Sequence, residues 1–205
     1  MSRYRPARLL LLVAGCLVLG LGVGLLLTAD LGSDGYSTLV NGISRATDTS
    51  FGICNLGVAV VFLALAATRR VTPDVGTVVQ ILVVGWTVAG LLALWDTPSD
   101  LAVRVLLLVV ALVVLAVGVA AYLGSNLGAG PAEAAALAWD PPVPFKWSYS
   151  ILQGGGALAG WLLGASVGPG TLAVIVGLGP MVDLAAHLLR LDVHQERHEP
   201  ATLDG

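Results

Sequence analysis

The chain has 205 residues, of which 57% are hydrophobic and 11% are charged, and its mean hydropathy is +0.90. Soluble domains carry about 25% charged residues, so this composition excludes a protein whose whole surface faces water. The net charge of −3 includes no long run of basic residues, which argues against a nucleic-acid partner.

Six apolar stretches follow one another along the chain, and each is long enough to cross the hydrocarbon core of a bilayer. The sequence therefore predicts an all-α polytopic membrane protein whose main partner is the lipid bilayer. The predicted spans are residues 9–29, 51–68, 75–95, 101–123, 147–165 and 170–190. Residues 1–8 and 191–205 are expected to form two tails on the same side of the membrane.

Two shorter segments follow the first and the fourth spans. Residues 35–47 place apolar side chains at helical spacing opposite polar ones, which predicts a short amphipathic helix. Residues 131–139 begin with Pro131 and carry Glu133 in the first turn, as helix starts often do, which predicts a second short helix.

An internal repeat relates the two halves of the chain. Shifting the sequence by 96 residues aligns the first span with the fourth, and a two-residue difference in loop length then changes the offset to 94. The matched positions are Asp30 with Asn126, Leu31-Gly32 with Leu127-Gly128, Gly76-Thr77 with Gly170-Thr171, and Gly85 with Gly179. Because these matches are not merely apolar, they predict a duplication of residues 9–95 as residues 101–190.

Each half contains three full spans, an odd number, so the second half is predicted to enter the membrane upside down. This is the inverted-repeat plan of many transporters. With a cytoplasmic amino terminus, the inside would hold Arg3, Arg5, Arg8, Arg69, Arg70, Lys146, Arg190 and Arg197, and the outside would hold Arg45 and Arg104. Eight to two obeys the positive-inside rule. If both short segments also crossed, eight spans would give the same ratio, so only segment length favours six.

The stretch from Gly22 to Gly57, its echo from Gly118 to Pro131, and the two Gly-Thr pairs resemble the YczE/YitT-like family of bacterial membrane proteins. The resemblance covers roughly residues 10 to 190 and implies a bacterial inner-membrane location, while it leaves substrate and mechanism open. It also implies an acidic residue late in the last span of a half. Asp183 matches that place, whereas the first half has Ala89 there.

No combination of residues suggests covalent catalysis. Three histidines, two isolated cysteines and the lack of HExxH, GxSxG or phosphate-loop motifs leave no catalytic constellation. We therefore expect a protein that is not an enzyme and that needs no cofactor or metal.

The last span holds the first candidate site. Gly179-Pro180 predicts a helix break, because proline lacks a backbone donor. Asp183 follows three residues later and His187 lies one turn beyond, and an ionisable residue inside a span is a candidate for binding a solute or an ion. The alternative is that the two side chains pair locally and anchor the helix.

Gln80 and Gln153 are expected at the same depth as Asp183, so three helices would offer polar groups together. The alternative is that each amide bonds a neighbouring helix.

Asn55 is expected near Asp30 and Asp34 at the other face of the membrane, where it would line an outer vestibule or cap a helix. Asn126 is the counterpart of Asp30 in the second half.

The starts of the two short segments form the second candidate site, because paired short helices at matching places in two halves often mark a transporter's binding site. Their amide groups would be free to hold an anionic group. Asp34 and Glu133 already occupy those positive ends, however, so simple capping is the alternative.

Gly156, Gly160 and Gly164 repeat at four-residue spacing in the fifth span, which predicts close helix packing and not ligand contact.

We expect the protein to bind or move a small polar solute between its two halves. Two other classes stay open: a non-transporting membrane scaffold or regulator, and a substrate-binding subunit that depends on separate ATPase partners, since the chain has no nucleotide-binding loop. Both termini are expected in the cytoplasm, and assembly into a homo-oligomer stays open.

Overall fold

The computed structural model describes residues 5–139 and 142–191, and this part of the chain is entirely helical. The predicted tails extend outside the described residues, at 1–4 and from 192 onward. The helices are α1 (Pro6–Ala29), α2 (Gly35–Thr47), α3 (Phe51–Ala67), α4 (Val75–Leu94), α5 (Leu101–Gly124), α6 (Pro131–Ala138), α7 (Phe145–Leu162) and α8 (Pro169–Leu189). The prediction of an all-helical chain is confirmed.

Helix boundaries follow local backbone chemistry. α1 begins earlier than predicted, at Pro6, because proline suits the first helical position. α7 ends at Leu162, three residues before the predicted 165, because Gly164 adopts φ +94°, a conformation that glycine reaches without strain. The chain therefore leaves the helix there and turns toward α8.

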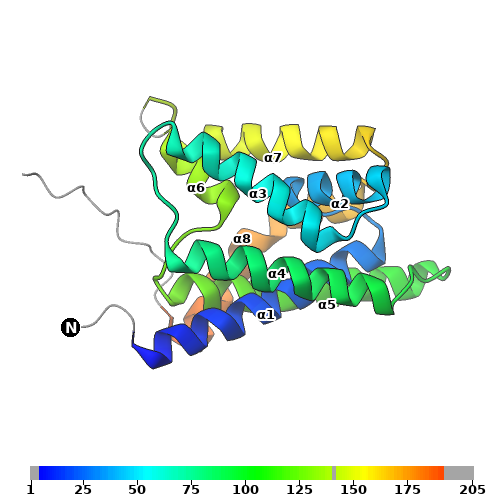
Figure 1. The fold of residues 1–205 in the computed structure, drawn as a ribbon. Coiled ribbons are helices and arrows are strands. Elements are labelled where there is room, and N and C mark those ends of the chain that lie inside the picture. The colour runs from blue at the N-terminus through cyan, green and yellow to red at the C-terminus, as the bar shows by residue number, and fades with distance from the viewer. Residues whose placement is uncertain (1–4, 140–141, 192–205) are drawn as a thin grey trace, which may run out of the picture.

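The helices form two groups that share a common long direction (Figure 1). α1 packs against α4 and α5, and α8 packs along α5. In the other group α2 packs against α7, and α6 lies between α3 and α7. α3 also packs on α4 and so joins the groups. The molecule therefore has two ends, one near the start of α1 and one near the start of α5.

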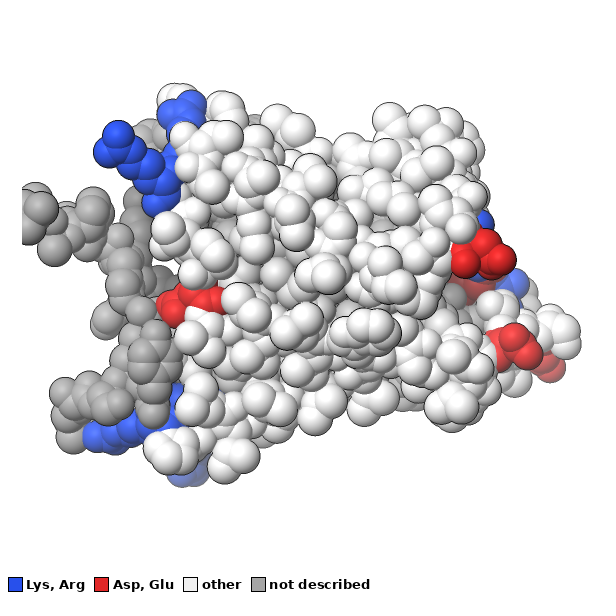
Figure 2. Space-filling view, viewed as in Figure 1, with Lys and Arg blue, Asp and Glu red and all other residues white. Residues whose placement is uncertain are grey.

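Charged side chains gather at these two ends and leave an uncharged band between them (Figure 2). Four helices have the length and hydropathy to cross a membrane, namely α1, α4, α5 and α8, and α3 is a shorter apolar helix. Many large apolar side chains on the outside of the bundle are exposed, including Val61 at 66% and Ile175 at 70%. Such a surface fits lipid, and the protein is a polytopic integral membrane protein.

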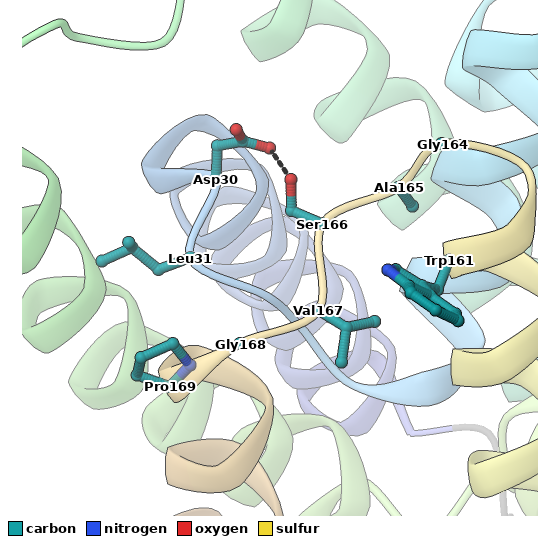
Figure 3. Close-up of a pocket in the computed structure, with 9 residues that line it drawn as sticks. All are labelled: Asp30, Leu31, Trp161, Gly164, Ala165, Ser166, Val167, Gly168 and Pro169. Carbon is teal, nitrogen blue, oxygen red and sulfur yellow. Dashed lines mark hydrogen bonds between the residues drawn. The ribbon is translucent and has the colours of Figure 1, made fainter.

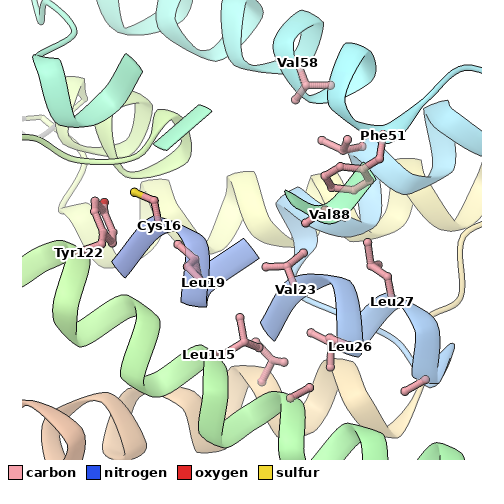
Figure 4. Packing of buried hydrophobic residues seen from close by; sticks show 14 of the residues in the cluster. Cys16, Leu19, Val23, Leu26, Leu27, Phe51, Val58, Val88, Leu115 and Tyr122 are labelled. Carbon is pink, nitrogen blue, oxygen red and sulfur yellow. The ribbon is translucent and has the colours of Figure 1, made fainter. Parts of the chain in front are cut away.

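The core lies where α1 and α5 approach closely. Figure 4 shows Leu19 and Val23 of α1 in the same buried cluster as Leu115 of α5. Glycines make this approach possible. A Cβ atom at Gly118 would clash with the backbone of Leu19, and one at Gly15 would lie 2.5 Å from the Tyr122 nitrogen. Lipid supplies no hydrophobic force between helices, so close backbone contact at small residues stabilises the pair.

α2 differs from the predicted surface-type amphipathic helix, because its polar face is buried as well. Ser37, Thr38 and Asn41 are at most 7% exposed. α2 therefore lies inside the bundle, where it packs against α7.

The glycines of α7 explain how α2 fits there. A Cβ at Gly156 would meet the carbonyl of Gly35, and one at Gly160 would meet the carbonyl of Thr38. Close packing is thus confirmed for these two glycines. It is wrong for Gly164, which lies beyond the end of α7 and has open space where a Cβ would stand.

The predicted helix break at Gly179-Pro180 is not present, because α8 is continuous from Pro169 to Leu189 with Pro180 inside it. A proline removes one backbone donor, and the turns on either side keep their own hydrogen bonds.

The α1–α5 contact leads to a first prediction. Gly118→Ala places a methyl group against the backbone of Leu19, which cannot move as a side-chain tip can, so we expect a loss of about 1–3 kcal/mol in the free energy of unfolding. Gly90→Ala is the matched control, because no atom lies within 4 Å of a Cβ at that helical glycine. Thermal unfolding of both purified variants in detergent measures the difference. Equal stability of the two would contradict glycine-dependent packing of α1 on α5.

Candidate functional site

The two short helices begin inside the bundle and run outward to opposite ends (Figure 1). α2 ends near Asp30, to which Arg45 of α2 donates a hydrogen bond. α6 ends near the close of α3, where the Arg69 guanidinium lies 4.4 Å from the Trp139 ring. At 1.5 Å per residue their lengths sum to about 32 Å, close to the roughly 30 Å of a bilayer core. Both amino-terminal starts lie in the middle of the bundle, away from its two ends (Figure 1).

The loops that lead to these starts have the same backbone path. Asp30, which caps the end of α1, and Asn126, two residues after the end of α5, adopt φ +52° and +58°. Gly32 and Gly128 follow with φ +103° and +136°, which residues with a side chain rarely adopt. Glycine at these two places thus lets the chain turn back into the membrane.

Each returning loop is held by the start of a helix from the other half. The Gly170 amide donates to the Leu31 carbonyl at 2.8 Å, and the Gly76 amide donates to the Leu127 carbonyl, also at 2.8 Å. The threonine that follows each glycine lies against the same loop. A Cβ at Gly32 would clash with the hydroxyl of Thr171, and Thr77 donates to the Ala129 carbonyl at 2.7 Å. The two Gly-Thr pairs therefore satisfy backbone groups that lipid would leave unpaired.

Side chains cap the first turn of α2. The Asp34 carboxylate accepts a hydrogen bond from the Ser37 amide at 3.0 Å. The Tyr36 amide donates to the Gln153 side-chain carbonyl at 2.9 Å, and the Gln153 amide group donates to the Tyr149 hydroxyl at 2.7 Å. Gln153 thus ties the start of α2 to the middle of α7.

Asn55 connects α2 to two further helices. The Tyr36 hydroxyl donates to the Asn55 side-chain oxygen at 3.0 Å, and the Asn55 amide group donates to the Ile81 carbonyl at 2.9 Å. Asn55 is 3% exposed, and Gly85 leaves room for it, since a Cβ there would lie 2.6 Å from the amide nitrogen. Asn55 is therefore a packed bridge among α2, α3 and α4, and it does not line an open vestibule.

The start of α6 has its own polar groups. The Gly130 amide donates to the Tyr122 hydroxyl at 2.7 Å. Glu133 and Gln80 both reach Gly130, because a Cβ there would lie 2.5 Å from a Glu133 carboxylate oxygen and 2.6 Å from the Gln80 amide nitrogen. Glu133 also lies within electrostatic range of Asp34 and of Tyr36.

These residues form one cluster, which we name the central cluster. It comprises Asp34, Tyr36, Gln80, Tyr122, Glu133, Tyr149 and Gln153. Two carboxyl groups, three phenols and two amides offer both donors and acceptors to a polar solute. The positive ends of α2 and α6 favour negative charge nearby, which offsets part of the cost of placing carboxylates there.

A second group of charged residues lies at the end where α1 finishes. The Asp30 carboxylate pairs with Arg45 at 3.0 Å and with Arg104 at 3.4 Å, and it accepts a hydrogen bond from the Ser166 hydroxyl. Arg104 also donates to the Ala29 carbonyl at 2.7 Å. Asp30 thus joins α1, α2, α5 and the α7–α8 loop.

An open hollow of about 490 Å³ lies beside this carboxylate. Figure 3 shows it between Asp30, Trp161 and the loop that contains Ser166 and Gly168.

Asp183 and His187 do not join the central cluster. Both are exposed on the outer side of α8, which packs along α5. Their predicted role in solute or ion binding, together with Gln80 and Gln153, stays a prediction.

The sequence interpretation missed the three tyrosines. Tyr36 lies in the segment predicted as an amphipathic helix, and Tyr122 and Tyr149 lie in predicted spans, but none of them was predicted as a site residue. The available signal was that a tyrosine hydroxyl needs a hydrogen-bond partner when it is buried.

Apolar helices long enough to span a bilayer, with an apolar exterior and a half-buried polar cluster, define a helical integral membrane protein. The chain belongs to the family of unknown function DUF6198, whose profile matches residues 6–187. It is similar to an uncharacterized protein of Haemophilus influenzae (strain ATCC 51907 / DSM 11121 / KW20 / Rd), with 24% identity over 190 residues that cover 92% of this chain and 86% of that protein. No solved structure matches the chain. The resemblance to the YczE/YitT-like family stays an expectation.

The Tyr36–Asn55 contact leads to a second prediction. In a double-mutant cycle of Tyr36→Phe and Asn55→Ala we expect a coupling of about 0.6–2 kcal/mol, the range of hydrogen bonds between membrane helices. As a control, Tyr36→Phe should be additive with Thr68→Ala, because Thr68 bonds only locally, to the Leu65 carbonyl. Unfolding of the purified variants in mixed micelles supplies the free energies. A coupling free energy of zero between the two substitutions would show that the contact does not hold α2 in place.

Proposed function

We propose that the protein is a transporter or permease that moves a small polar solute across the membrane through the central cluster. The observation that carries the proposal is the pair of short helices whose starts lie in the middle of the bundle (Figure 1), where the polar side chains of the central cluster surround them. Transporters commonly bind solutes where interrupted helices present their amino-terminal ends. Asp34 and Glu133 are the groups that would take a proton or a cationic part of the solute.

The proposed architecture is an inverted repeat of three spans and one short helix per half. Corresponding contacts recur in both halves: α1 packs on α4 as α5 does on α8, and α2 packs on α7 as α6 does on α3. The reciprocal bonds from Gly76 to Leu127 and from Gly170 to Leu31 support the same relation. Six spans with inward-facing short helices agree with these contacts.

The proposed location is the bacterial inner membrane, with both termini in the cytoplasm. The arginines at 69 and 70 lie at the end where α1 starts, and the acidic residues Asp96 and Asp100 lie at the other (Figures 1 and 2). Basic residues prefer the cytoplasmic side, which supports this orientation. The hollow beside Asp30 would then open outward and form the outer entrance.

This topology gives a third prediction. Single cysteines at Thr72 and Ser99, in a background with Cys16→Ala and Cys54→Ala, should differ in access, because both positions are exposed but lie at opposite ends of the bundle. In intact cells an impermeant maleimide should label position 99, and position 72 should react only after the membrane is opened. Labelling at 72 in intact cells, with 99 protected, would reverse the proposed orientation. Labelling of both from outside would contradict the six-span proposal.

A second candidate function is that of a membrane scaffold or regulator, favoured by how completely side chains within the chain cap the start of α2. A subunit that captures solute for separate ATPase partners is a third. Transport by the purified protein alone distinguishes the first proposal from both.

The fourth prediction concerns transport itself. Purified protein in liposomes should accumulate at least one member of a defined mixture of amino acids, nucleosides and polyamines, measured by mass spectrometry of the lumen. The double variant Asp34→Asn and Glu133→Gln keeps shape but removes both charges, so we expect uptake to fall at least about tenfold, equivalent to about 1.4 kcal/mol.

Asp96→Asn is the matched control, because it removes a charge from the exposed α4–α5 connection. Thermal unfolding of all variants shows whether each is folded. Full uptake by a folded double variant would rule out the central cluster as the transport site. No uptake of any compound by the native protein would favour the scaffold or the ATPase-dependent subunit.

A further inference from the structure

The outer face of α8 has a composition that does not suit contact with lipid. We define this face as Val176, Gly179, Pro180, Asp183 and His187, which recur at helical spacing and are all exposed. Asp183 lies six residues before the end of α8, so about 9 Å of helix separates it from that end. Ionisable residues within membrane helices almost always face protein or a water-filled cavity, and here both Asp183 and His187 point away from their own bundle.

The corresponding surface of α4 shows what such a face normally contacts. Gly85-Trp86 stands 94 residues before Gly179-Pro180, and α3 covers the glycine of this pair: a Cβ at Gly85 would meet Asn55. Trp86 lies against Gly52 on one side and is otherwise 57% exposed. At Gly179 a Cβ would meet nothing within 4 Å. Within the described chain, α7 does not pack along α8 as α3 packs along α4.

In the first half, the amide side chain of Asn55 on α3 contacts α4, and the corresponding position on α7 has no amide. Residue 151, which stands 96 residues after Asn55, is an isoleucine that is 68% exposed. α7 therefore offers neither the contact nor the polar group, and the α8 outer face lacks the neighbour that its counterpart has.

We propose that the α8 outer face binds the same face of a second copy of this chain, so that the protein forms a homodimer with its two-fold axis along the membrane normal. Complementary polar groups on the face, the carboxylate of Asp183 as acceptor and the imidazole of His187 as donor, support a second copy as the occupant. When two parallel helices interdigitate, a side chain packs among residues three and four positions away on its neighbour. Asp183 of one copy then lies beside His187 of the other, and the reverse contact follows from symmetry.

Small residues complete the fit. Gly179 lets two helices approach closely, as glycines do at the α1–α5 contact, and Val176 continues the same line one turn earlier. The dimer would pair the side chains of Asp183 and His187 away from lipid. This inference depends only on the membrane location and on α8, so it stands or falls separately from transport.

The test is disulfide cross-linking in native membranes. In the background with Cys16→Ala and Cys54→Ala, Val176→Cys and Gly179→Cys are each oxidised with copper phenanthroline, which enters the bilayer. We expect covalent dimers at both positions. Val61→Cys on α3 and Leu106→Cys on α5 are the controls, because these side chains are 66% and 61% exposed on other faces of the bundle.

The polar pair has its own readout. Dimerisation of the full chain in liposomes, followed by single-molecule photobleaching over a range of protein-to-lipid ratios, should weaken about three- to tenfold in Asp183→Asn and in His187→Ala. Asp96→Asn should not change it. Native protein that is monomeric at all ratios, or cross-linking as frequent at Val61 and Leu106 as on α8, would overturn the proposal and leave lipid as the occupant of this face. Dimers that form without cross-links at 176 and 179 would overturn it in favour of another interface.

Discussion

Backbone polar groups inside a bilayer must find partners within the protein, and this constraint governs the whole structure. The chain has irregular backbone inside the bundle twice, after Asp30 and after Asn126, and in each case a glycine amide at the start of a spanning helix donates to the loop carbonyl. Lipid could not replace either bond. The donor to the first loop, Gly170, belongs to the second half, and the donor to the second loop, Gly76, belongs to the first, so each half supplies a backbone partner to the other. The two short helices that contribute Asp34 and Glu133 to the central cluster thus follow loops that the halves hold for each other.

Much of the fold could be predicted from the sequence because the length and hydropathy of an apolar stretch identify a membrane helix. All eight helices were expected, and residues 35–47 matched α2 at both ends. The repeat alignment also showed that Leu31-Gly32 and Gly76-Thr77 recur in the second half, but it did not predict that these residues contact the loops of the opposite half. Their contact is made across the halves, between residues far apart along the chain, and a shared glycine reveals a backbone requirement without revealing the partner that imposes it.

The central cluster could be predicted only in part. Asp34 and Glu133 were expected at helix starts, and Gln80 and Gln153 were expected at a common depth, but nothing in their spacing joined these pairs. That connection depends on how far each loop returns into the bundle. The polar side of α2 did not reveal its surroundings for a related reason. An amphipathic pattern shows that a helix has two different environments, and here the environment of the polar side is protein and not water.

The residues that follow α1 and α5 occupy matching positions in the repeat, but they differ in charge. Asp30 engages two arginines and a serine, whereas its counterpart is the neutral Asn126. The Arg45 and Asp30 side chains are 43% and 24% exposed, so dissolved ions can reach and screen that pair. Higher ionic strength at that end of the molecule would therefore weaken the attraction between Arg45 and Asp30 and loosen the contact between the parts that meet there.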